Sequence, residues 1–360
     1  MKKTLVALAV LAASGAVLAQ VTVKGNLTSG FKSVTTGTSG PAGTSSDGGL
    51  NVGSSGFGVD TAEITFSASE DLGGGMKAGA SMGLVNVVRG AGTTPPVAGS
   101  NAAWAGNFGP ANTSLYVSGD FGKITLATAR GTEYLTGGVA AVGGTYQDAR
   151  VFSSRDASDS VTYSMTTGSF GISVAYAEPN NYLGLGAGTS GFNSGTTSGA
   201  TAANSQSNTA LGLRYTDGPL VADAGYTIYD EGDTADKLGD KTNMRVAGSY
   251  DLGVAKLGAG WTQRTGKVGT RTDMSIAASV PMGAVTLGAN WVQRDLNSFR
   301  VENGPKVLNI GYGLSANYAL SKRTSFIADY TAYTGQNGGT GLNNNADMTS
   351  VYNLLLSHSF

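Results

Sequence analysis

The stretch Asp273–Val280, which reads DMSIAASV, alternates polar or small residues with apolar ones. A short turn, Pro281–Gly283, separates it from Val285–Trp291, which alternates in the same way. Alternation with a period of two predicts β-strands with one apolar and one polar face. The two stretches therefore predict a hairpin, and the same alternation recurs in Val21–Leu27 and Thr242–Tyr250.

Short turns alternate regularly with long loops rich in Gly, Ser, Thr and Asn along the whole chain. Seven such turns predict seven hairpins, and one further strand at each terminus brings the total to sixteen. An even number places both termini on the same side of the sheet. The predicted strands are 21–34, 57–70, 76–88, 111–119, 123–130, 158–166, 170–179, 208–217, 220–230, 241–251, 254–265, 271–280, 284–295, 306–320, 324–334 and 348–360.

The composition excludes several classes of function. Only 13% of the 360 residues are charged, about half the usual share of a soluble domain. The chain has no cysteine, which excludes disulfides, thiol catalysis and cysteine metal sites. Its single histidine, His358, argues against a His-rich zinc site or an ordinary Ser-His-Asp triad.

The length and polarity of the strands favour a membrane barrel over a soluble β-sandwich, which is the alternative. Past residue 19 no stretch is apolar and long enough to cross a membrane as a helix. A sheet in hydrocarbon must be closed, because its backbone groups find no other partners, and a barrel of sixteen strands is too wide for side chains to fill. The sequence therefore predicts an all-β fold, a transmembrane antiparallel β-barrel of sixteen strands around a wet lumen.

Residues 1–19 are predicted to be a secretory signal peptide. Lys2 and Lys3 precede the mostly apolar Leu5–Leu18, and small or modest side chains stand at the cleavage positions Val17–Ala19. The mature barrel would then span residues 20–360, with 21 basic residues (23 minus two) against 24 acidic ones, a net charge of −3. This balance gives no sign of nucleic acid or an anionic membrane surface as a partner.

Three segments resemble the general porins of Gram-negative bacteria, in particular their β-proteobacterial branch. Ser69–Ala78 (SEDLGGGMKA) resembles the second hairpin, Gly122–Leu126 (GKITL) is similar to the fifth strand, and Tyr352–Phe360 resembles the closing strand with its terminal Phe. The resemblance covers residues 20–360. It implies an outer-membrane homotrimer of sixteen-stranded barrels, each with a third loop folded inward, that lets ions and small hydrophilic solutes diffuse passively without a cofactor.

The C-terminal strand carries the predicted assembly signal. Tyr352, Leu354, Leu356 and Phe360 share one face, which we expect to contact outer-membrane lipids. In the porin family the terminal aromatic residue is also read by the outer-membrane insertion machinery. His358 interrupts this row near the rim and is expected to be structural.

The segment of about 131–157 is the candidate constriction loop, because it follows the fifth strand and contains the small-residue stretch Gly137–Gly144. Its charges would set a transverse field at the narrowest point. An outward loop with exposed charge pairs is the alternative, and the resemblance favours the inward one. The predicted constriction residues are Arg130, Glu133, Asp148, Arg150, Arg155 and Asp156.

Basic residues on the polar phase of the strands predict a mild anion preference. Charges in distant loops are screened within a Debye length of roughly 8 Å, so residues in the lumen outweigh the net charge of −3. Asp223, Asp273 and Asp329 oppose the basic residues only in part. The predicted lumen residues are Lys24, Lys32, Arg245, Lys256 and Arg264.

Two other functions stay open at this point: a substrate-specific channel, and an adhesin that uses the barrel as a scaffold for its loops. No motif predicts an enzyme. The acidic cluster 230–240 does not have the spacing of an EF-hand and is predicted to be a solvated loop rather than a Ca²⁺ site. If the barrel is correct, a cysteine at Ser275 should react from lumen water, and one at Ile276 only with lipid-soluble reagents.

Overall fold

The structure is a computed structural model of residues 1–360. It describes residues 20–35, 55–86, 108–130, 135, 138–145, 147, 150–152, 157–179, 206–230, 239–299, 306–334 and 348–360. The predicted signal peptide and most long loops lie outside these ranges. Within them, no helix is long and apolar enough to cross a membrane.

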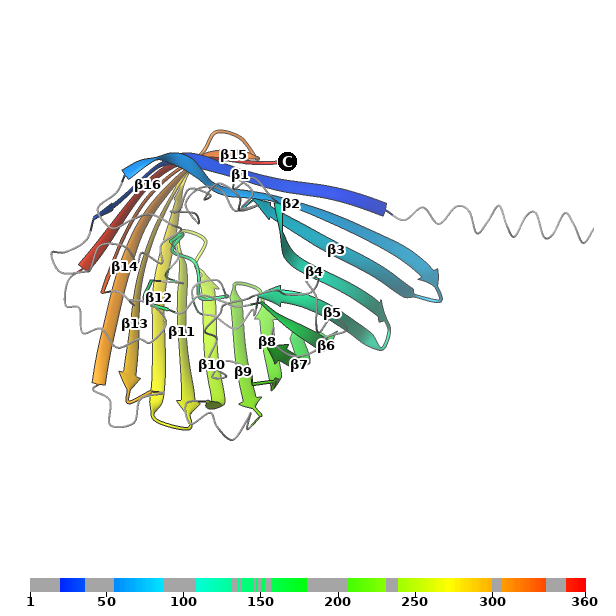
Figure 1. The fold of residues 1–360 in the computed structure, drawn as a ribbon. Helices are drawn as coiled ribbons and strands as arrows, with labels where there is room; N and C mark the ends of the chain where they lie inside the picture. The colour runs from blue at the N-terminus through cyan, green and yellow to red at the C-terminus, as the bar shows by residue number, and fades with distance from the viewer. Residues whose placement is uncertain are drawn as a thin grey trace, which may run out of the picture.

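Sixteen antiparallel strands follow one another in chain order around a closed barrel (Figure 1). Most of their ends lie within a few residues of the predicted ones. The strands are β1 (Gln20–Thr35), β2 (Ser55–Gly73), β3 (Met76–Asn86), β4 (Phe108–Gly119), β5 (Gly122–Arg130), β6 (Ala157–Thr167), β7 (Phe170–Pro179), β8 (Asn208–Asp217), β9 (Leu220–Tyr229), β10 (Asp240–Asp251), β11 (Lys256–Gly266), β12 (Thr270–Met282), β13 (Val285–Asn297), β14 (Lys306–Ala319), β15 (Thr324–Thr334) and β16 (Met348–Ser359).

The barrel closes where the first strand pairs with the last. β1 and β16 are antiparallel, with Leu27 opposite His358 and Phe31 opposite Leu354. Gly25 and Phe360 exchange two backbone hydrogen bonds of 3.0 Å each. A Cβ at Gly25 would lie 2.1 Å from the Phe360 ring, so the missing side chain makes room for the terminal aromatic. The closed sheet leaves no strand edge unpaired, as a membrane requires.

The two faces of the barrel differ in the way the alternation predicts. Large apolar side chains such as Leu126, Ile276 and Leu314 are exposed on the outer face. Their strand neighbours point to the other face, which in a closed barrel is the lumen. An apolar outside and a polar inside are typical of a barrel that spans a membrane.

Two of the short turns share a local motif. Asp71-Leu72-Gly73 and Asp251-Leu252-Gly253 both place an Asp side chain so that its Oδ1 accepts a 2.8 Å hydrogen bond from the Gly N–H. Both glycines have positive φ, 82° and 81°, a conformation that suits glycine because it has no Cβ. The D-L-G sequence thus explains why the chain reverses at these positions.

One part of the lumen face is apolar. An apolar cluster inside the barrel joins wall residues, among them Val292 and Val351, to residues of the segment 131–157, among them Leu135 and Val151. The wall is apolar there because the segment covers it and excludes water. The lumen-facing wall is therefore dry on this side of the barrel.

Candidate functional site

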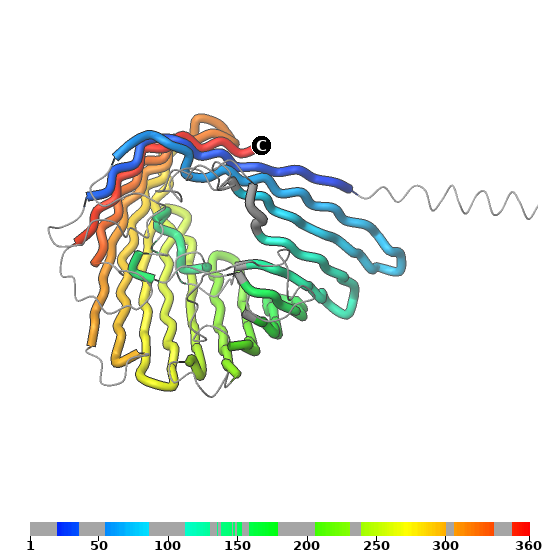
Figure 2. The backbone as a smooth tube through the Cα atoms, in the orientation of Figure 1, coloured from blue at the N-terminus to red at the C-terminus, as the bar shows by residue number. Residues whose placement is uncertain are grey.

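The described residues of the segment 131–157 lie against one side of the barrel's inner face (Figure 2). Ser315 Oγ on β14 donates a 2.8 Å hydrogen bond to Gly143 O. Asn290 Nδ2 on β13 donates one of the same length to Thr145 O. These contacts join the segment to lumen-facing wall residues far away in the sequence.

Glycines on the wall make room for this segment. A Cβ at Gly258 would lie 2.3 Å from the Ala140 carbonyl oxygen, and one at Gly288 would lie 2.3 Å from the Gly143 carbonyl oxygen. A Cβ at Gly313 would lie 2.0 Å from Thr145 Oγ1. Any side chain at these three positions on β11, β13 and β14 would collide with the segment. The close approach of the two backbones therefore depends on glycine.

Polar groups are enclosed between the segment and the wall. Gln147 is fully buried, and neither its Oε1 nor its Nε2 has a hydrogen-bond partner among the described residues. Thr145 Oγ1 and Asn290 Oδ1 are buried in the same way. Buried polar atoms of this kind are commonly satisfied by ordered water.

Four lumen-facing arginines on the neighbouring strands β10–β13 pair with three aspartates. The closest pair is bidentate: Arg294 Nε and Nη2 donate to the two oxygens of Asp273 at 2.7 and 2.9 Å. Both side chains are almost completely buried. The other ion pairs are Arg245–Asp223 at 3.0 Å, Arg264–Asp240 at 3.0 Å and Arg271–Asp273 at 3.3 Å.

Two arginines join the segment 131–157 to the wall through contacts with aromatic rings. Arg294 Cζ lies 5.3 Å from the ring centroid of Phe152 in the segment. Arg150, which belongs to the segment, donates a 2.9 Å hydrogen bond to Thr331 Oγ1 and lies 5.9 Å from the ring of Tyr333. Both distances are within the range of a cation–π contact.

Of the predicted constriction residues, Arg150 is the one whose side chain the structure describes. It is buried against β15. Arg130 is the last residue of β5, and the structure does not describe its side chain. The remaining four, Glu133, Asp148, Arg155 and Asp156, lie outside the described residues. The transverse field that they would create with Arg150 therefore stays a prediction.

The predicted lumen residues separate into two groups. Arg245 and Arg264 belong to the arginine network described above. Lys24 and Lys256 lie near the short-turn end of the barrel and are exposed, and Lys32 Nζ lies 3.9 Å from Asp60 Oδ1. The sequence does not indicate that Asp273 and Arg294 form a buried pair. Their shared polar phase was visible, but it gives no information on burial.

Ser275 corrects one sequence-based expectation. It lies on the lumen phase as predicted, but only 2% of its surface is exposed. Ile276, on the outer face, is 56% exposed. A cysteine at Ser275 should therefore react slowly with an aqueous reagent, because the position is buried on the covered side of the barrel.

The predicted assembly residues of β16 lie on the outer face. Tyr352, Leu354, Leu356 and Phe360 are all exposed there, and the rings of Tyr352 and Tyr330 are 4.8 Å apart. This arrangement suits contact with lipid. Their role as an insertion signal stays a prediction.

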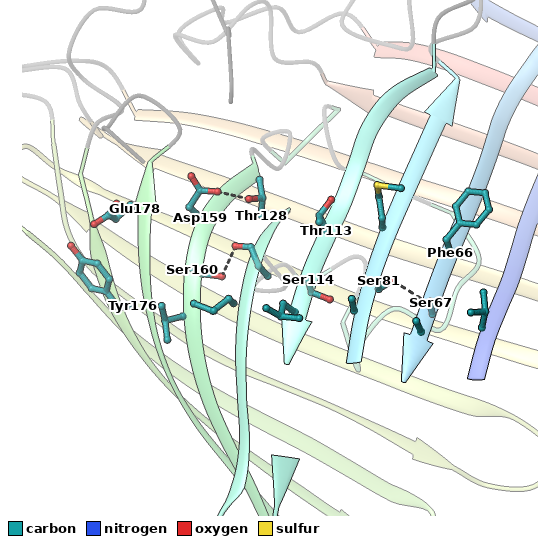
Figure 3. Close-up of a pocket in the computed structure, with 18 residues that line it drawn as sticks. Phe66, Ser67, Ser81, Thr113, Ser114, Thr128, Asp159, Ser160, Tyr176 and Glu178 are labelled. Atoms are coloured by element: carbon teal, nitrogen blue, oxygen red, sulfur yellow. Dashed lines mark hydrogen bonds between the residues drawn. The ribbon is translucent and has the colours of Figure 1, made fainter. Parts of the chain in front are cut away.

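A groove with a volume of about 740 Å³ crosses β2–β7, and most of the side chains along it point away from the lumen (Figure 3). Its lining includes the exposed Phe66 and Leu115 and the small Ala80. At one end Thr128 Oγ1 donates to the Asp159 carboxylate, and Glu178 lies opposite Asp159 on the next strand. The groove is therefore a feature of the outer surface.

The comparisons with known proteins agree with this fold. The family model for Gram-negative porins matches residues 4–338. An anion-selective porin from Comamonas acidovorans has a similar structure, with a TM-score of 0.64 at 19% identity, over 95% of this chain and 100% of that one. The trimer form of OmpT, an outer-membrane protein of Vibrio cholerae, gives a TM-score of 0.58 at 15% identity, over 95% and 99% of the two chains. No curated protein sequence matches.

A closed sixteen-stranded barrel with an apolar outside and charged residues in the lumen defines an outer-membrane channel protein. The match across most of the chain shows that the protein belongs to the Gram-negative porin family. It is thus a porin that crosses the outer membrane many times with β-strands.

Proposed function

We propose that the barrel is a water-filled channel for passive diffusion of ions and small hydrophilic solutes, with a mild preference for anions. The observation that carries this proposal is the charge of the lumen. Besides Lys24 and Lys256, which lie near the short-turn end, seven basic residues are described on the lumen side against six acidic ones. They are Lys32, Arg150, Arg214, Arg245, Arg264, Arg271 and Arg294, against Asp60, Glu63, Asp223, Asp240, Asp273 and Asp329.

This excess is small, so the preference should be mild. A positive potential in a narrow, water-filled passage lowers the free energy of an anion there and raises that of a cation. The Comamonas porin is named as anion-selective, which agrees in sign. At 19% identity that likeness supports only the fold, and the lumen charges carry the argument.

Planar bilayers test this proposal directly. The purified protein should give ohmic conductance, and in a salt gradient its zero-current potential should have the sign of an anion-preferring channel. Liposomes that contain it should admit small sugars without saturation. A potential of cationic sign would overturn the anion preference. Saturable uptake of one solute, with poor passage of others of equal size, would replace the general channel with a substrate-specific one.

We also propose that three copies assemble and that residues 1–19 are removed before assembly. The Vibrio protein in its trimer form supports the first point, and the basic start followed by the mostly apolar Leu5–Leu18 supports the second. Mass measurement of the detergent-solubilised protein should give three chains, and N-terminal sequencing should begin at Gln20. A monomer, or a retained leader, would contradict the respective point.

We propose no catalytic role for the barrel. His358 lies on the outer face, where its Nδ1 forms a 2.9 Å hydrogen bond with Thr324 Oγ1. A histidine in that position cannot activate a nucleophile in the lumen. Hydrolysis of an ester or peptide that depends on His358 would contradict this proposal.

A further inference from the structure

We infer that the short turns of the barrel are membrane anchors. Apolar side chains at these turns insert into the headgroup layer of the periplasmic leaflet instead of projecting into water. The partner is a phospholipid surface, because short turns of outer-membrane barrels lie on the periplasmic side. Five of the seven short turns carry an exposed large apolar residue, which we call a tip residue. The tip residues are Leu72, Phe121, Leu252, Met282 and Leu320.

The tip residues continue the apolar rows of the outer face. In β12, Val280 and Met282 are two positions apart and both are exposed, so they point to the same side of the strand. Leu252 follows the exposed Tyr250 of β10 by two residues in the same way. Tyrosine at this level of a barrel is typical of the membrane–water interface. An apolar residue beyond it extends the lipid-facing row toward the headgroups.

The turn between β4 and β5 shows directly that a tip residue leans outward. A Cβ at Gly119 would lie 2.9 Å from Phe121 Cε1 and 3.3 Å from Met76 Cγ. Gly119 is two positions after Val117, which is exposed on the outer face. Tyr163, exposed on the same face of β6, donates a 2.6 Å hydrogen bond from its hydroxyl to Phe121 O. The Phe121 ring therefore folds back over the outer surface and away from the lumen.

The long-loop end of the barrel has the opposite character. There the outward rows end in polar or charged residues at or within two positions of the strand ends. Examples are Asp159, Glu178, Asp295, Lys306 and Thr334. Polar ends of this kind suit water. Since the outer surface is polar at one end and apolar at the other, the short-turn end lies deeper in the membrane boundary.

The turns also satisfy their own backbone groups, which a water-poor layer requires. Leu252 N–H donates to Ala255 O at 2.8 Å, and Leu320 N–H donates to Thr324 O at 2.9 Å. Asp251 Oδ1 accepts the Gly253 N–H at 2.8 Å. A turn closed in this way leaves fewer backbone groups to be hydrated, so its apolar tip can leave water at little cost.

Fluorophores on single cysteines measure the depth of the tips, because the chain has no cysteine of its own. The full-length protein with Leu252→Cys or Leu320→Cys is labelled and placed in vesicles of phosphatidylcholine and phosphatidylethanolamine, so that lipid alone can cover the turns. A nitroxide near the headgroup end of the acyl chain should quench both labels strongly. Aqueous iodide should quench them several times less than the free dye. Iodide quenching equal to that of the free dye would overturn the inference.

Stability in the same vesicles gives a second readout. Leu320 is 49% exposed in the barrel alone. Leu320→Ser should raise the equilibrium constant for unfolding by about fivefold, the loss expected when the remaining half of a leucine surface is no longer covered by lipid. Leu252→Ser is the second variant, should Leu320→Ser fail to fold. An unfolding constant unchanged in both variants would place the tips in water and overturn the inference.

The matched control is Lys322→Ser, an exposed residue of the same turn as Leu320. It should leave the unfolding constant unchanged, because a charged side chain gains nothing from apolar contact. An equal loss in Lys322→Ser and Leu320→Ser would show that the turn, and not lipid contact, is at stake, and would overturn the inference. Single-channel conductance should be the same in all variants. A conductance changed in Leu320→Ser would place the tip at the lumen mouth and contradict the anchor.

Discussion

Two sides of the lumen wall differ in whether the segment 131–157 lies on them. On β11–β15 the segment 131–157 covers the wall, and Val292, Arg294 and Thr331 are almost fully buried. On β7 and β8, Ser173 is partly exposed and Arg214 is exposed. Both sides follow the same alternation of residues. The comparison shows that one sequence pattern can build both a dry and a wet inner wall, depending on whether a loop lies on it.

The largest expected effect is the loss of stability when one partner of a buried ion pair is removed, compared with the loss for an exposed pair. Asp273→Asn leaves Arg294 buried without a carboxylate, and it should lower the free energy of unfolding by about 3–5 kcal/mol. Lys306→Gln breaks the exposed pair with Asp295, of 2.9 Å, and should cost about 0–1 kcal/mol. Urea titration of the barrel in lipid vesicles measures both. Equal losses would show that the Asp273 pair is not buried.

The glycines beneath the loop should give the next largest effect. Gly313→Val places a side chain where Thr145 already lies, and overpacking of this kind costs about 1–3 kcal/mol. We expect the segment to leave the wall and the single-channel conductance to change. Gly171→Val is the control, because its Cβ meets nothing closer than 3.7 Å. A conductance altered equally in both variants would contradict the claim that the segment needs glycine at position 313 to lie against the wall.

Ion selectivity should change least. Removing a charge ~7 Å from a passing ion in water changes the energy of that ion by about 0.6 kcal/mol, or roughly threefold in permeability. Arg150→Ala, alone and together with Arg155→Ala, should therefore move the zero-current potential toward cations. The change should grow at low ionic strength, where screening is weaker. An unchanged potential would place these arginines outside the constriction.

The barrel itself could be predicted from the sequence, because strands and short turns depend on local patterns. The D-L-G turns and the alternation in Asp273–Val280 are visible without a structure. Differences occur at strand ends. β11 begins at Lys256 rather than at residue 254, because Leu252 N–H donates to Ala255 O at 2.8 Å and completes the turn.

The covered wall could not be predicted in the same way. It depends on contacts between residues far apart in the chain, such as Ser315 with Gly143. The burial of Ser275 and the pairing of Asp273 with Arg294 follow from the barrel's closure and from the segment on its wall. Alternation assigns a residue to the lumen face, but it carries no information on what covers that face.

The central claim is that the segment 131–157 covers one side of the lumen wall and leaves the other side open to water. The reactivity of single introduced cysteines tests this claim most directly. The chain has no cysteine of its own, so each introduced thiol reports on one position. In outer-membrane vesicles an aqueous thiol reagent should label Ser173→Cys rapidly, Ser275→Cys far more slowly, and Ile276→Cys only when the reagent is lipid-soluble. Rapid aqueous labelling of Ser275→Cys, at the rate of Ser173→Cys, would contradict the covered wall, and aqueous labelling of all three would contradict the barrel in the membrane.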